Sequence, residues 1–370
     1  MYQFHSPQTR VLVYADKAFS RKMRLKFSLR AKTADGYLRY AKSEIVGVID
    51  STATENYVSD VIGIRNDIPI FPTIASFLEK TNIKPDALLI GVAPAGGDIE
   101  KIMFQDICYA IEQGMHIISG MHFELGKNEH LQQLAKIYQK ELWDVRIPPQ
   151  TLPVASAKAY FIKKPIILTC AADAAIGKMT VALELEKELL KRNILGEMIA
   201  TGQTGIMIKG RGISIDRVIG DFMPGAVEQL LVDCENDRPE NRYLILEGQG
   251  GLFHPGYAPV TLALLHGGLP SHLILVVRPL RKHSIGSKLI KIPSIREIQE
   301  KYFASSLGIR IPKFIGIAAN TAGMSEKAAQ SFIAETKNET GLPVEDVIRS
   351  PDQSLAAAVE KVVLDYEMTL

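Results

Sequence analysis

The run AADAAIGKMT, Ala171–Thr180, constrains the fold of this chain more than any other feature. It follows the apolar run Ile166–Cys170 and precedes a helical pattern that ends at Arg192. Strand, tight loop, Gly-Lys and helix in this order are typical of a phosphate-binding loop, in which backbone N–H groups and a lysine face an anion. The sequence therefore predicts an α/β domain that binds a phosphate-rich ligand at the end of one strand.

The loop and the first helical turn carry the predicted phosphate-binding residues. These are Asp173, Ala174, Ala175, Ile176, Gly177, Lys178, Met179 and Thr180. Gly177 allows a close approach of the backbone, and Lys178 would pair with phosphate oxygens. Thr180 is the candidate hydroxyl for a phosphate or a magnesium ion, one residue later than in the usual P-loop pattern. Asp173 could orient the loop or contact a cationic group of a substrate.

Short apolar runs alternate with helical stretches on both sides of a proline-rich segment at Pro148, Pro149 and Pro153. The predicted strands are Arg10–Tyr14, Ile45–Ile49, Ala87–Gly91, Met115–Ser119, Ile166–Cys170, Gly196–Ala200, Tyr243–Glu247, His272–Val277 and Lys313–Ala319. The predicted helices are Ile99–Gln113, Lys127–Glu141, Thr180–Arg192, Pro224–Asp233, Ser294–Ser305 and Glu326–Glu339. This alternation predicts parallel sheets with helices on their faces. The prolines predict a domain boundary or a stiff crossover.

Composition and charge give no support for nucleic acid or a membrane as the binding partner. Apolar residues make up 46% of the 370 residues, and 43 basic against 41 acidic residues give a net charge of +2, which offers no argument for nucleic acid or membrane as a partner. The three cysteines lack metal-ligand spacing, and neither a signal sequence nor a bilayer-length apolar run is present. We expect a cytoplasmic homo-oligomer that acts on a small molecule.

A second candidate element is YLILEGQGG, Tyr243–Gly251. Its acid, Glu247, ends an apolar strand, where a carboxylate could orient magnesium or act as a base opposite a P-loop. Gly248, Gln249 and Gly250 would bring another backbone segment to the same ligand. His254, next to a Pro-Gly turn, is a candidate general base. His266 is better explained as a packed or capping residue.

Weaker candidates follow other predicted strands. Gln203 lies in the segment TGQTG, and Asp221 precedes a helix that begins with proline, where capping and catalysis are both open. Asn320 and Thr321 sit where P-loop folds often contact a purine. Arg278 leads a basic cluster that continues with Arg281, Lys282 and His283 and could hold a phosphate or a carboxylate. The glycine-rich run Gly91–Asp98 is either a ligand loop or a tight turn.

Basic residues also gather near the N-terminus. They are Lys17, Arg21, Lys22, Arg24, Lys26, Arg30 and Lys32. This cluster is either a solvated face or a loop that contacts phosphate or carboxylate groups.

Several of these segments together resemble the domain-of-unknown-function family 1611, which includes D-glutamate N-acetyltransferases. The segments are AADAAIGKMT, TGQTG, GDFMPGAVE, EGQGGLFHPGYAPVTLALLHG, GIAANT and GLPVEDVIR, with AKTADGYLRY, VGVIDS, GVAPAGG and SGMH nearer the N-terminus. The resemblance covers almost the whole chain. It implies a Rossmann-like domain over residues 1–150 and a P-loop domain, similar to dethiobiotin synthetase, over residues 151–370. The late Thr180 matches the family loop GTDCxxGKMT, whereas Ala171, Ala172 and Ala174 depart from it.

The resemblance implies acetyl transfer from acetyl-CoA to an amine, with the loop holding CoA phosphates and Glu247 or His254 as base. Two alternatives stay open at this point. The first is a ligase or kinase that uses Mg-ATP on a carboxylate, with Thr180 and Glu247 orienting magnesium. The second is a non-catalytic module that senses nucleotides or CoA.

Overall fold

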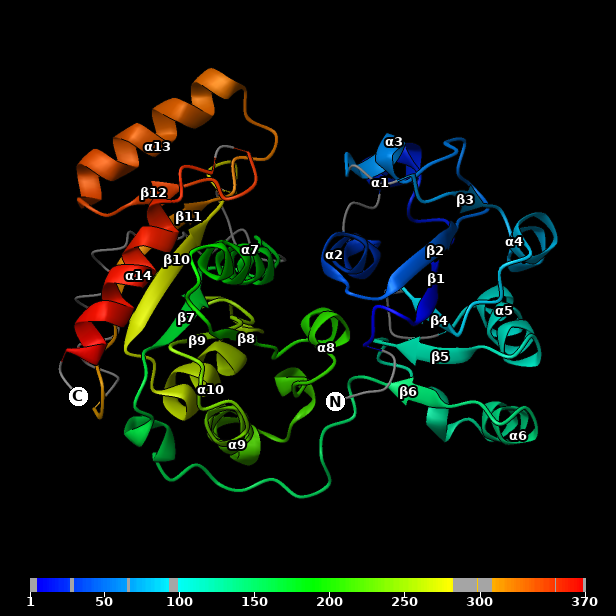
Figure 1. The fold of residues 1–370 in the computed structure, drawn as a ribbon, viewed down its shortest axis with the longest axis horizontal. Helices are drawn as coiled ribbons and strands as arrows, with labels where there is room; N and C mark the ends of the chain where they lie inside the picture. Colours follow the sequence, from blue (N-terminus) through cyan, green and yellow to red (C-terminus); the bar gives the residue numbers. More distant parts are fainter. Residues whose placement is uncertain are drawn as a thin grey trace. The chain divides into compact units, whose positions relative to one another are not determined.

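The computed structural model describes residues 5–26, 30–64, 67–92, 99–281, 298, 308–349 and 351–368. These residues form two compact units, and each is built on its own six-stranded sheet. The first unit ends at Pro148 but also includes Gln203–Ser214, and the second unit comprises Pro149–Gly202 and the residues from Ile215 onward. The predicted α/β fold with two parallel sheets is therefore confirmed (Figure 1).

The sheet of the first unit is parallel, with the strand order β3-β2-β1-β4-β5-β6. Its strands are β1 (Arg10–Tyr14), β2 (Glu44–Ile49), β3 (Ile70–Phe71), β4 (Ala87–Ile90), β5 (His116–Ser119) and β6 (Leu142–Asp144). The direction of strand progression reverses between β1 and β4, which is the position where ligands bind in open α/β sheets. The four predicted strands of this half are confirmed within one residue at each end. The short edge strands β3 and β6 were not predicted.

Helices flank this sheet and one of them comes from the later sequence. They are α1 (Arg21–Lys26), α2 (Lys32–Tyr40), α3 (Ser59–Ile62), α4 (Ile74–Thr81), α5 (Lys101–Glu112), α6 (Glu129–Ile137) and α8 (Gln203–Lys209). Helix α8 packs against α2. A single domain boundary at residue 150 would assign α8 to the second unit, whereas α8 belongs to the first. A local sequence pattern does not reveal which sheet a short helix covers.

The sheet of the second unit is also parallel, with the order β12-β11-β10-β7-β9-β8. Its strands are β7 (Ile166–Cys170), β8 (Glu197–Ile199), β9 (Leu244–Leu246), β10 (His272–Val277), β11 (Lys313–Ala319) and β12 (Val344–Glu345). All five residues of β7 are buried, as expected for a central strand covered on both faces. All five predicted strands of this half are confirmed, and β12 was not predicted.

The helices of the second unit are α7 (Lys178–Lys191), α9 (Met223–Asp237), α10 (Ala258–Gly268), α13 (Glu326–Thr340) and α14 (Ser354–Glu367). Helix α7 packs against α14, and α9 packs against α10, so helices cover the sheet from both sides (Figure 1). The predicted helix Ser294–Ser305 lies outside the described residues, apart from Ile298.

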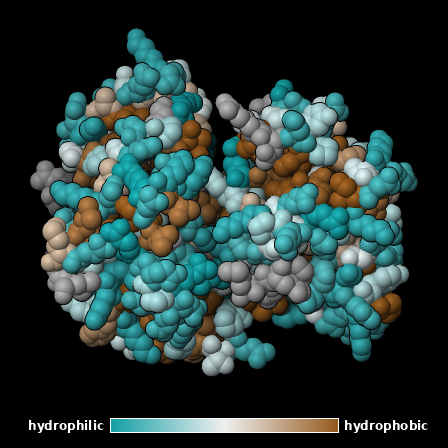
Figure 2. Space-filling model, viewed as in Figure 1, coloured by the Kyte–Doolittle hydropathy of each residue, from teal (hydrophilic) through white to brown (hydrophobic). Residues whose placement is uncertain are grey.

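Polar side chains cover most of the face of each unit that Figure 2 shows, and apolar patches lie between them. Within the described part of the chain, no helix is both long and apolar enough to cross a bilayer. Cys170 is buried at the end of β7, and this burial raises the pKa of its thiol to about 12.

Candidate functional site

The predicted phosphate loop is the connection between β7 and α7. Its backbone takes left-handed conformations at Ala175, with φ 53°, and at Gly177, with φ 118°. Gly177 occupies the N-cap of α7 and has no side chain that could cap the helix. The first N–H groups of an α-helix have no partner within the helix, and their positive dipole end attracts anions. The loop and the N-terminus of α7 thus supply backbone N–H groups for an anion site.

Carbonyl groups of the loop are tied to donors elsewhere in the second unit. The pairs are Ala171 O with Leu252 N (2.9 Å), Ala172 O with Phe253 N (3.4 Å), Asp173 O with Lys178 Nζ (2.9 Å) and Ile176 O with Asn320 Nδ2 (2.8 Å). In a trans peptide the C=O group and the following N–H group point in opposite directions. Tethering these carbonyls to the protein therefore turns the N–H groups of the same peptides toward the other side of the loop.

Lys178 is the first residue of α7, and its side chain is 6% exposed. Its ammonium group donates to the carbonyl of Asp173 at 2.9 Å and to the carbonyl of Gly250 at 2.6 Å. The lysine therefore joins the phosphate loop to the glycine-rich segment after β9. A buried ammonium held between backbone carbonyls is a fixed positive charge, as a phosphate-binding loop requires.

Asp173 is fully buried in the middle of the loop. Its Oδ1 accepts from the N–H of Ala174 at 2.7 Å, and its Oδ2 pairs with the guanidinium of Arg281 at 3.1 Å. Asp173 thus orients the loop and also holds a cation that follows β10. The sequence indicated Arg281 only as part of a basic cluster, and its pairing with Asp173 was not predicted. Lys282 and His283 of that cluster lie outside the described residues.

The glycines after β9 allow two backbone segments to cross. A Cβ atom on Gly248 would lie 1.6 Å from the carbonyl oxygen of Thr169, and one on Gly251 would lie 2.5 Å from Cα of Asp173. Gly250 has φ 65°, which favours glycine. The segment therefore lies against the phosphate loop, and its predicted contact with the same ligand stays a prediction. The N–H of Gly248 donates to Thr169 Oγ1 at 3.0 Å, so this N–H is already bound within the protein.

Glu247 ends β9 and is 2% exposed. Its Oε2 accepts from the N–H groups of Thr201 at 2.9 Å and of Gly202 at 3.2 Å, and the Thr201 hydroxyl donates to its carbonyl at 2.7 Å. The carboxylate is therefore fixed across the ends of β8 and β9. Its partner Thr201 belongs to the segment TGQTG but was not singled out, because a hydroxyl at a strand end has no distinctive spacing.

His254 is 7% exposed and stacks on Tyr257, with ring centroids 4.3 Å apart. Its Nδ1 accepts from the backbone N–H of Gly256 at 3.1 Å. A backbone N–H is always a donor, so the neutral imidazole carries its proton on Nε2. In this geometry the neutral ring has a proton on Nε2 and uses the lone pair of Nδ1 for the Gly256 N–H, so neither nitrogen is free to accept a proton. The prediction of His254 as a general base is therefore at odds with its hydrogen bonding.

Asn320 and Thr321, after β11, form bonds within the protein. The Asn320 side chain donates to Ile176 and accepts from the N–H of Ala322 at 3.2 Å. The N–H of Thr321 donates to Asp346 at 3.1 Å, and its hydroxyl donates to the same carboxylate oxygen. Burial raises the pKa of Asp346, but hydrogen bonds from Thr321, Arg349 and Ile348 outweigh it, so the pKa lies below its ordinary value. Asn320 therefore braces the phosphate loop, and Thr321 is tied to the segment after β12, while their contact with a purine stays a prediction.

The remaining predicted residues occupy different places. Gln249 lies beside Gly202, and its carbonyl accepts from Thr261 Oγ1 at 2.6 Å. Gln203 starts α8 in the first unit, where its side chain packs against Gly120, so it is grouped with the other sheet. Asp221 is exposed in the 3₁₀ helix Gly220–Phe222 before α9. The N-cap of α9 is Phe222, which excludes capping by Asp221 and leaves its catalytic role as a prediction.

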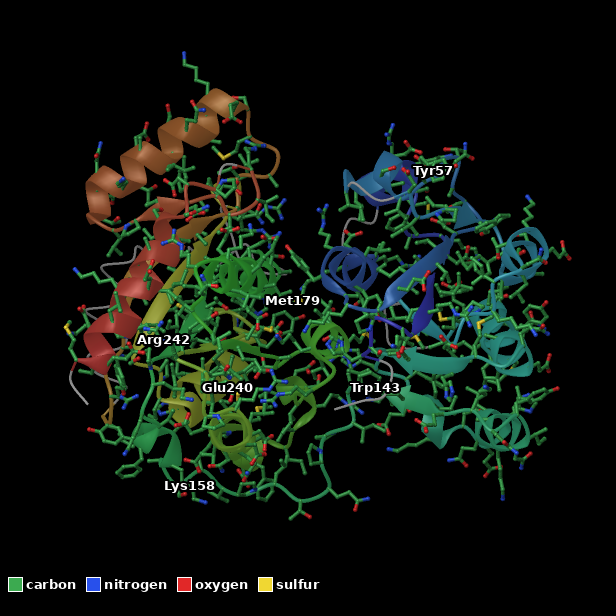
Figure 3. All side chains as sticks on the ribbon, viewed as in Figure 1. Tyr57, Trp143, Lys158, Met179, Glu240 and Arg242 are labelled. Atoms are coloured by element: carbon green, nitrogen blue, oxygen red, sulfur yellow. The ribbon has the colours of Figure 1, made fainter. Side chains whose placement is uncertain are left out.

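Three further predicted residues flank the loop. Arg278 follows β10 and is half-buried. Met179 and Thr180 are half-buried in the first turn of α7, and Met179 is labelled in Figure 3. Among the described residues, no group of three or more His, Cys, Asp or Glu side chains is arranged to hold a metal ion. Most of the run Gly91–Asp98, from residue 93 onward, lies outside the described residues.

The fold and the loop define a two-domain α/β protein with a P-loop. Residues 153–356 match the P-loop domain of DUF1611, a domain of unknown function, and residues 51–148 match its Rossmann-like N-terminal domain. The chain belongs to the DUF1611 family. It is similar over 96% of its length to the crystal structure of a DUF1611 family protein from Anabaena variabilis, all of which is covered, with a TM-score of 0.86 and 35% identity.

Two curated relatives carry the name D-glutamate N-acetyltransferase. One, from Tritonibacter scottomollicae, is 37% identical over 265 residues, which cover 71% of this chain and 77% of the relative. The other, from Pseudoalteromonas sp, is 35% identical over 283 residues, which cover 76% of this chain and 83% of the relative.

Proposed function

We propose that this protein is an N-acetyltransferase that moves the acetyl group of acetyl-CoA to the amine of an amino acid such as D-glutamate. The observation that carries the proposal is the loop between β7 and α7, whose carbonyls are tethered to the protein and whose lysine is held between two carbonyls. The names of the two relatives supply the reaction class, and they favour it over the ATP-dependent alternative.

The chemistry of CoA fits this loop. CoA carries a pyrophosphate and a 3′-phosphate, which suit a helix N-terminus, a buried lysine and a nearby arginine. A thioester acylates an amine without a magnesium ion or a γ-phosphate. The position of Thr180, one residue late for the usual magnesium contact, would then matter little.

Glu247 is the better base in this proposal. The acceptor enters as an ammonium ion, and the Glu247 carboxylate would take one of its protons. The amine nitrogen then bonds to the thioester carbon, the C–S bond breaks, and the CoA thiolate leaves and takes up a proton. His254, with a hydrogen on Nε2 in its neutral form, would serve as a hydrogen-bond donor to the developing oxyanion.

Ligand-induced thermal shifts test the loop. The full-length protein is heated with CoA, acetyl-CoA, ATP or ADP, with and without magnesium. We expect stabilisation by CoA and acetyl-CoA that does not depend on the metal, since a ligand that binds the native state raises its stability. Stabilisation by ATP alone, dependent on magnesium, would overturn the proposal.

Replacement of Lys178 by Ala should weaken acetyl-CoA binding by roughly 10- to 100-fold, because charge-assisted hydrogen bonds contribute about 1.5–3 kcal/mol. Lys187→Ala is the matched control, because Lys187 is an exposed lysine of the same helix that pairs with Glu184. Calorimetric titration measures both affinities. Release of CoA in the presence of D-glutamate, followed with a thiol reagent, then tests turnover, and Glu247→Gln should abolish it while leaving acetyl-CoA binding in place.

A further inference from the structure

An arginine that follows β10 lies beside the phosphate loop of the second unit. Strand β10 pairs with β7 in parallel, so the turn after β10 and the loop after β7 lie at the same edge of the sheet. Arg281 closes this turn, and its backbone N–H donates to the carbonyl of Arg278 at 2.8 Å. Its Nη1 lies 3.1 Å from Asp173 Oδ2. The loop therefore has a second cation in addition to Lys178.

The pairing with Asp173 occupies only part of the Arg281 guanidinium. An arginine carries five N–H donors in a planar fork, and the bond to Asp173 runs from Nη1 alone. Among the residues that the structure describes, Asp173 is the one hydrogen-bond or ion-pair partner of this side chain. The Arg281 side chain is 20% exposed, whereas that of Asp173 is fully buried. The other donors of the guanidinium can therefore bind a ligand while the pair stays intact.

Asp173 fixes the arginine on the loop. Its Oδ1 accepts from the N–H of Ala174 at 2.7 Å, so the carboxylate has a defined orientation behind the guanidinium. A side chain that is already ordered loses less conformational entropy when a ligand binds. A carboxylate in the middle of an anion-binding loop would repel an anion, and its pairing with Arg281 offsets that charge. The position of Asp173 in the loop is thus explained by the cation that it holds.

The two cations of the loop contact different groups of Asp173. Lys178 Nζ donates to its backbone carbonyl at 2.9 Å, and Arg281 contacts its carboxylate. A ligand with two separate phosphate groups fits two such cations, because each phosphate then has its own partner. CoA is such a ligand, with a pyrophosphate on the 5′ carbon and a phosphate monoester on the 3′ carbon of one ribose. The monoester carries about two negative charges, and a guanidinium fork matches its oxygens.

We propose that Arg281 binds the 3′-phosphate of CoA, that Asp173 holds the arginine in position, and that the pair makes the site selective for CoA over dephospho-CoA. The backbone N–H groups of the loop and Lys178 then hold the pyrophosphate. Arg281 is a specificity-determining residue in this arrangement, and the fully buried Asp173 is a positioning residue. The inference rests on the proposed function, which supplies CoA as the ligand of the loop.

Calorimetric titration of the full-length protein with CoA and with dephospho-CoA tests the inference. The parent should bind CoA about tenfold or more tightly than dephospho-CoA, because a charge-assisted hydrogen bond is lost with the 3′-phosphate. Arg281→Met should weaken CoA by the same factor and change the affinity for dephospho-CoA by less than about twofold. An equal loss for both ligands would mean that the arginine only supports the loop, and an unchanged CoA affinity would mean that it does not touch the ligand. Either result overturns the inference.

The positioning role has a separate test. Asp173→Asn should reduce the preference for CoA over dephospho-CoA, although the residue is too deeply buried to touch either ligand. The double variant Asp173→Asn with Arg281→Met should show no greater loss of preference than Arg281→Met, because a positioning residue has no effect once its partner is absent. The double variant leaves no buried charge, so it also serves if Arg281→Met folds poorly. A double variant that still prefers CoA would overturn the inference.

Arg192→Met is the matched control. Arg192 caps the end of α7 that is remote from the loop, pairs with Glu360 at 2.7 Å and is 25% exposed, so the change removes a similar ion pair of the same unit. It should bind both ligands as the parent does. Binding of CoA that depends on Arg281, in a protein that transfers no acetyl group to an amino acid, would support the inference and overturn the proposed function. Acetyl transfer by a parent that binds CoA and dephospho-CoA equally would overturn the inference alone.

Discussion

The two units present the same strand-loop-helix arrangement at the centre of a parallel sheet, but they treat the loop backbone in opposite ways. After β1, Asp50 binds three N–H groups of the loop. After β7, the protein binds carbonyl groups of the loop through Lys178, Asn320 and the segment after β9. One carboxylate thus holds three N–H groups of the first loop, whereas the second loop is held mainly through its carbonyls, with a single N–H, that of Ala174, bound by the Asp173 carboxylate.

The two loops thus differ in which backbone groups the protein itself binds, N–H groups in the first loop and mainly C=O groups in the second. A loop whose N–H groups are bound by a carboxylate has fewer backbone donors to offer a phosphate. A loop whose carbonyls are bound keeps the geometry of an anion site. The second loop adds a buried lysine, Lys178, and the Asp173–Arg281 pair to this backbone geometry.

Asp50→Ala should break the first loop and have the largest effect on stability. The change leaves the N–H groups of Lys17, Phe19 and Ser20 without their acceptor, at about 1–3 kcal/mol for each buried group, so we expect a loss of about 4 kcal/mol in the free energy of unfolding. The single tryptophan, Trp143 in β6, reports on this unit by fluorescence during urea unfolding (Figure 3). Asp67→Ala, at an exposed position, is the control.

A loss below about 1 kcal/mol would show that Asp50 is not what fixes the loop after β1. A shift of the Trp143 transition of similar size in the Asp67→Ala variant would show that the effect is general rather than local to the loop.

Arg281→Met, in the second unit, should lower the free energy of unfolding by less than Asp50→Ala does. It removes one partner of the fully buried Asp173, and breaking such a pair is costly, but the arginine itself is 20% exposed, so we expect about 2 kcal/mol. In the double variant Asp173→Asn with Arg281→Met, most of this loss should disappear, because no buried charge is left after both changes. Urea unfolding followed by circular dichroism measures the cycle. Strictly additive effects would contradict a direct pairing.

The long central elements of both sheets could be predicted from the sequence because their apolar runs are nearly continuous. Strands β7, β10 and β11 begin and end where the pattern places them. The edge strands β3 and β12 could not, since each has two residues and takes its structure from the neighbouring strand. The sequence did not show that helix α8 belongs to the first unit. Its packing partner α2 is far away in sequence, so no local pattern links the two helices.

Part of the candidate site could also be predicted from the sequence, and part could not. The loop, Lys178 and the glycines after β9 have a spacing that indicates a phosphate-binding loop. The residues that bond to them have no such distinctive spacing. Arg281 could not be matched to Asp173, because 108 residues separate them. The direction of the Gly256 N–H, which sets the tautomer of His254, depends on a turn geometry that composition does not specify.

Acid should weaken both units through half-buried histidines, His5 and His116 in the first unit and His272 in the second, and this is the smallest effect we predict. Burial and nearby lysines lower the pKa of His5 in the first unit to about 4. Burial, Lys313 and Arg310 lower the pKa of His272 in the second unit to about 4. A histidine whose folded pKa is depressed binds its proton more readily in the unfolded state, so stability falls as the pH drops from about 6.5 to about 4.

His272→Gln should remove this loss in the second unit alone. Allowing for the partial exposure of the ring, we expect the variant to retain about 1 kcal/mol more of its stability than the parent does on going from pH 7 to pH 4.5. Circular dichroism should detect the difference during urea unfolding, while the Trp143 transition of the first unit should keep the pH dependence of the parent. An equal change in both signals would mean that the two units unfold together, and an unchanged pH dependence would mean that His272 does not carry the acid sensitivity of its unit.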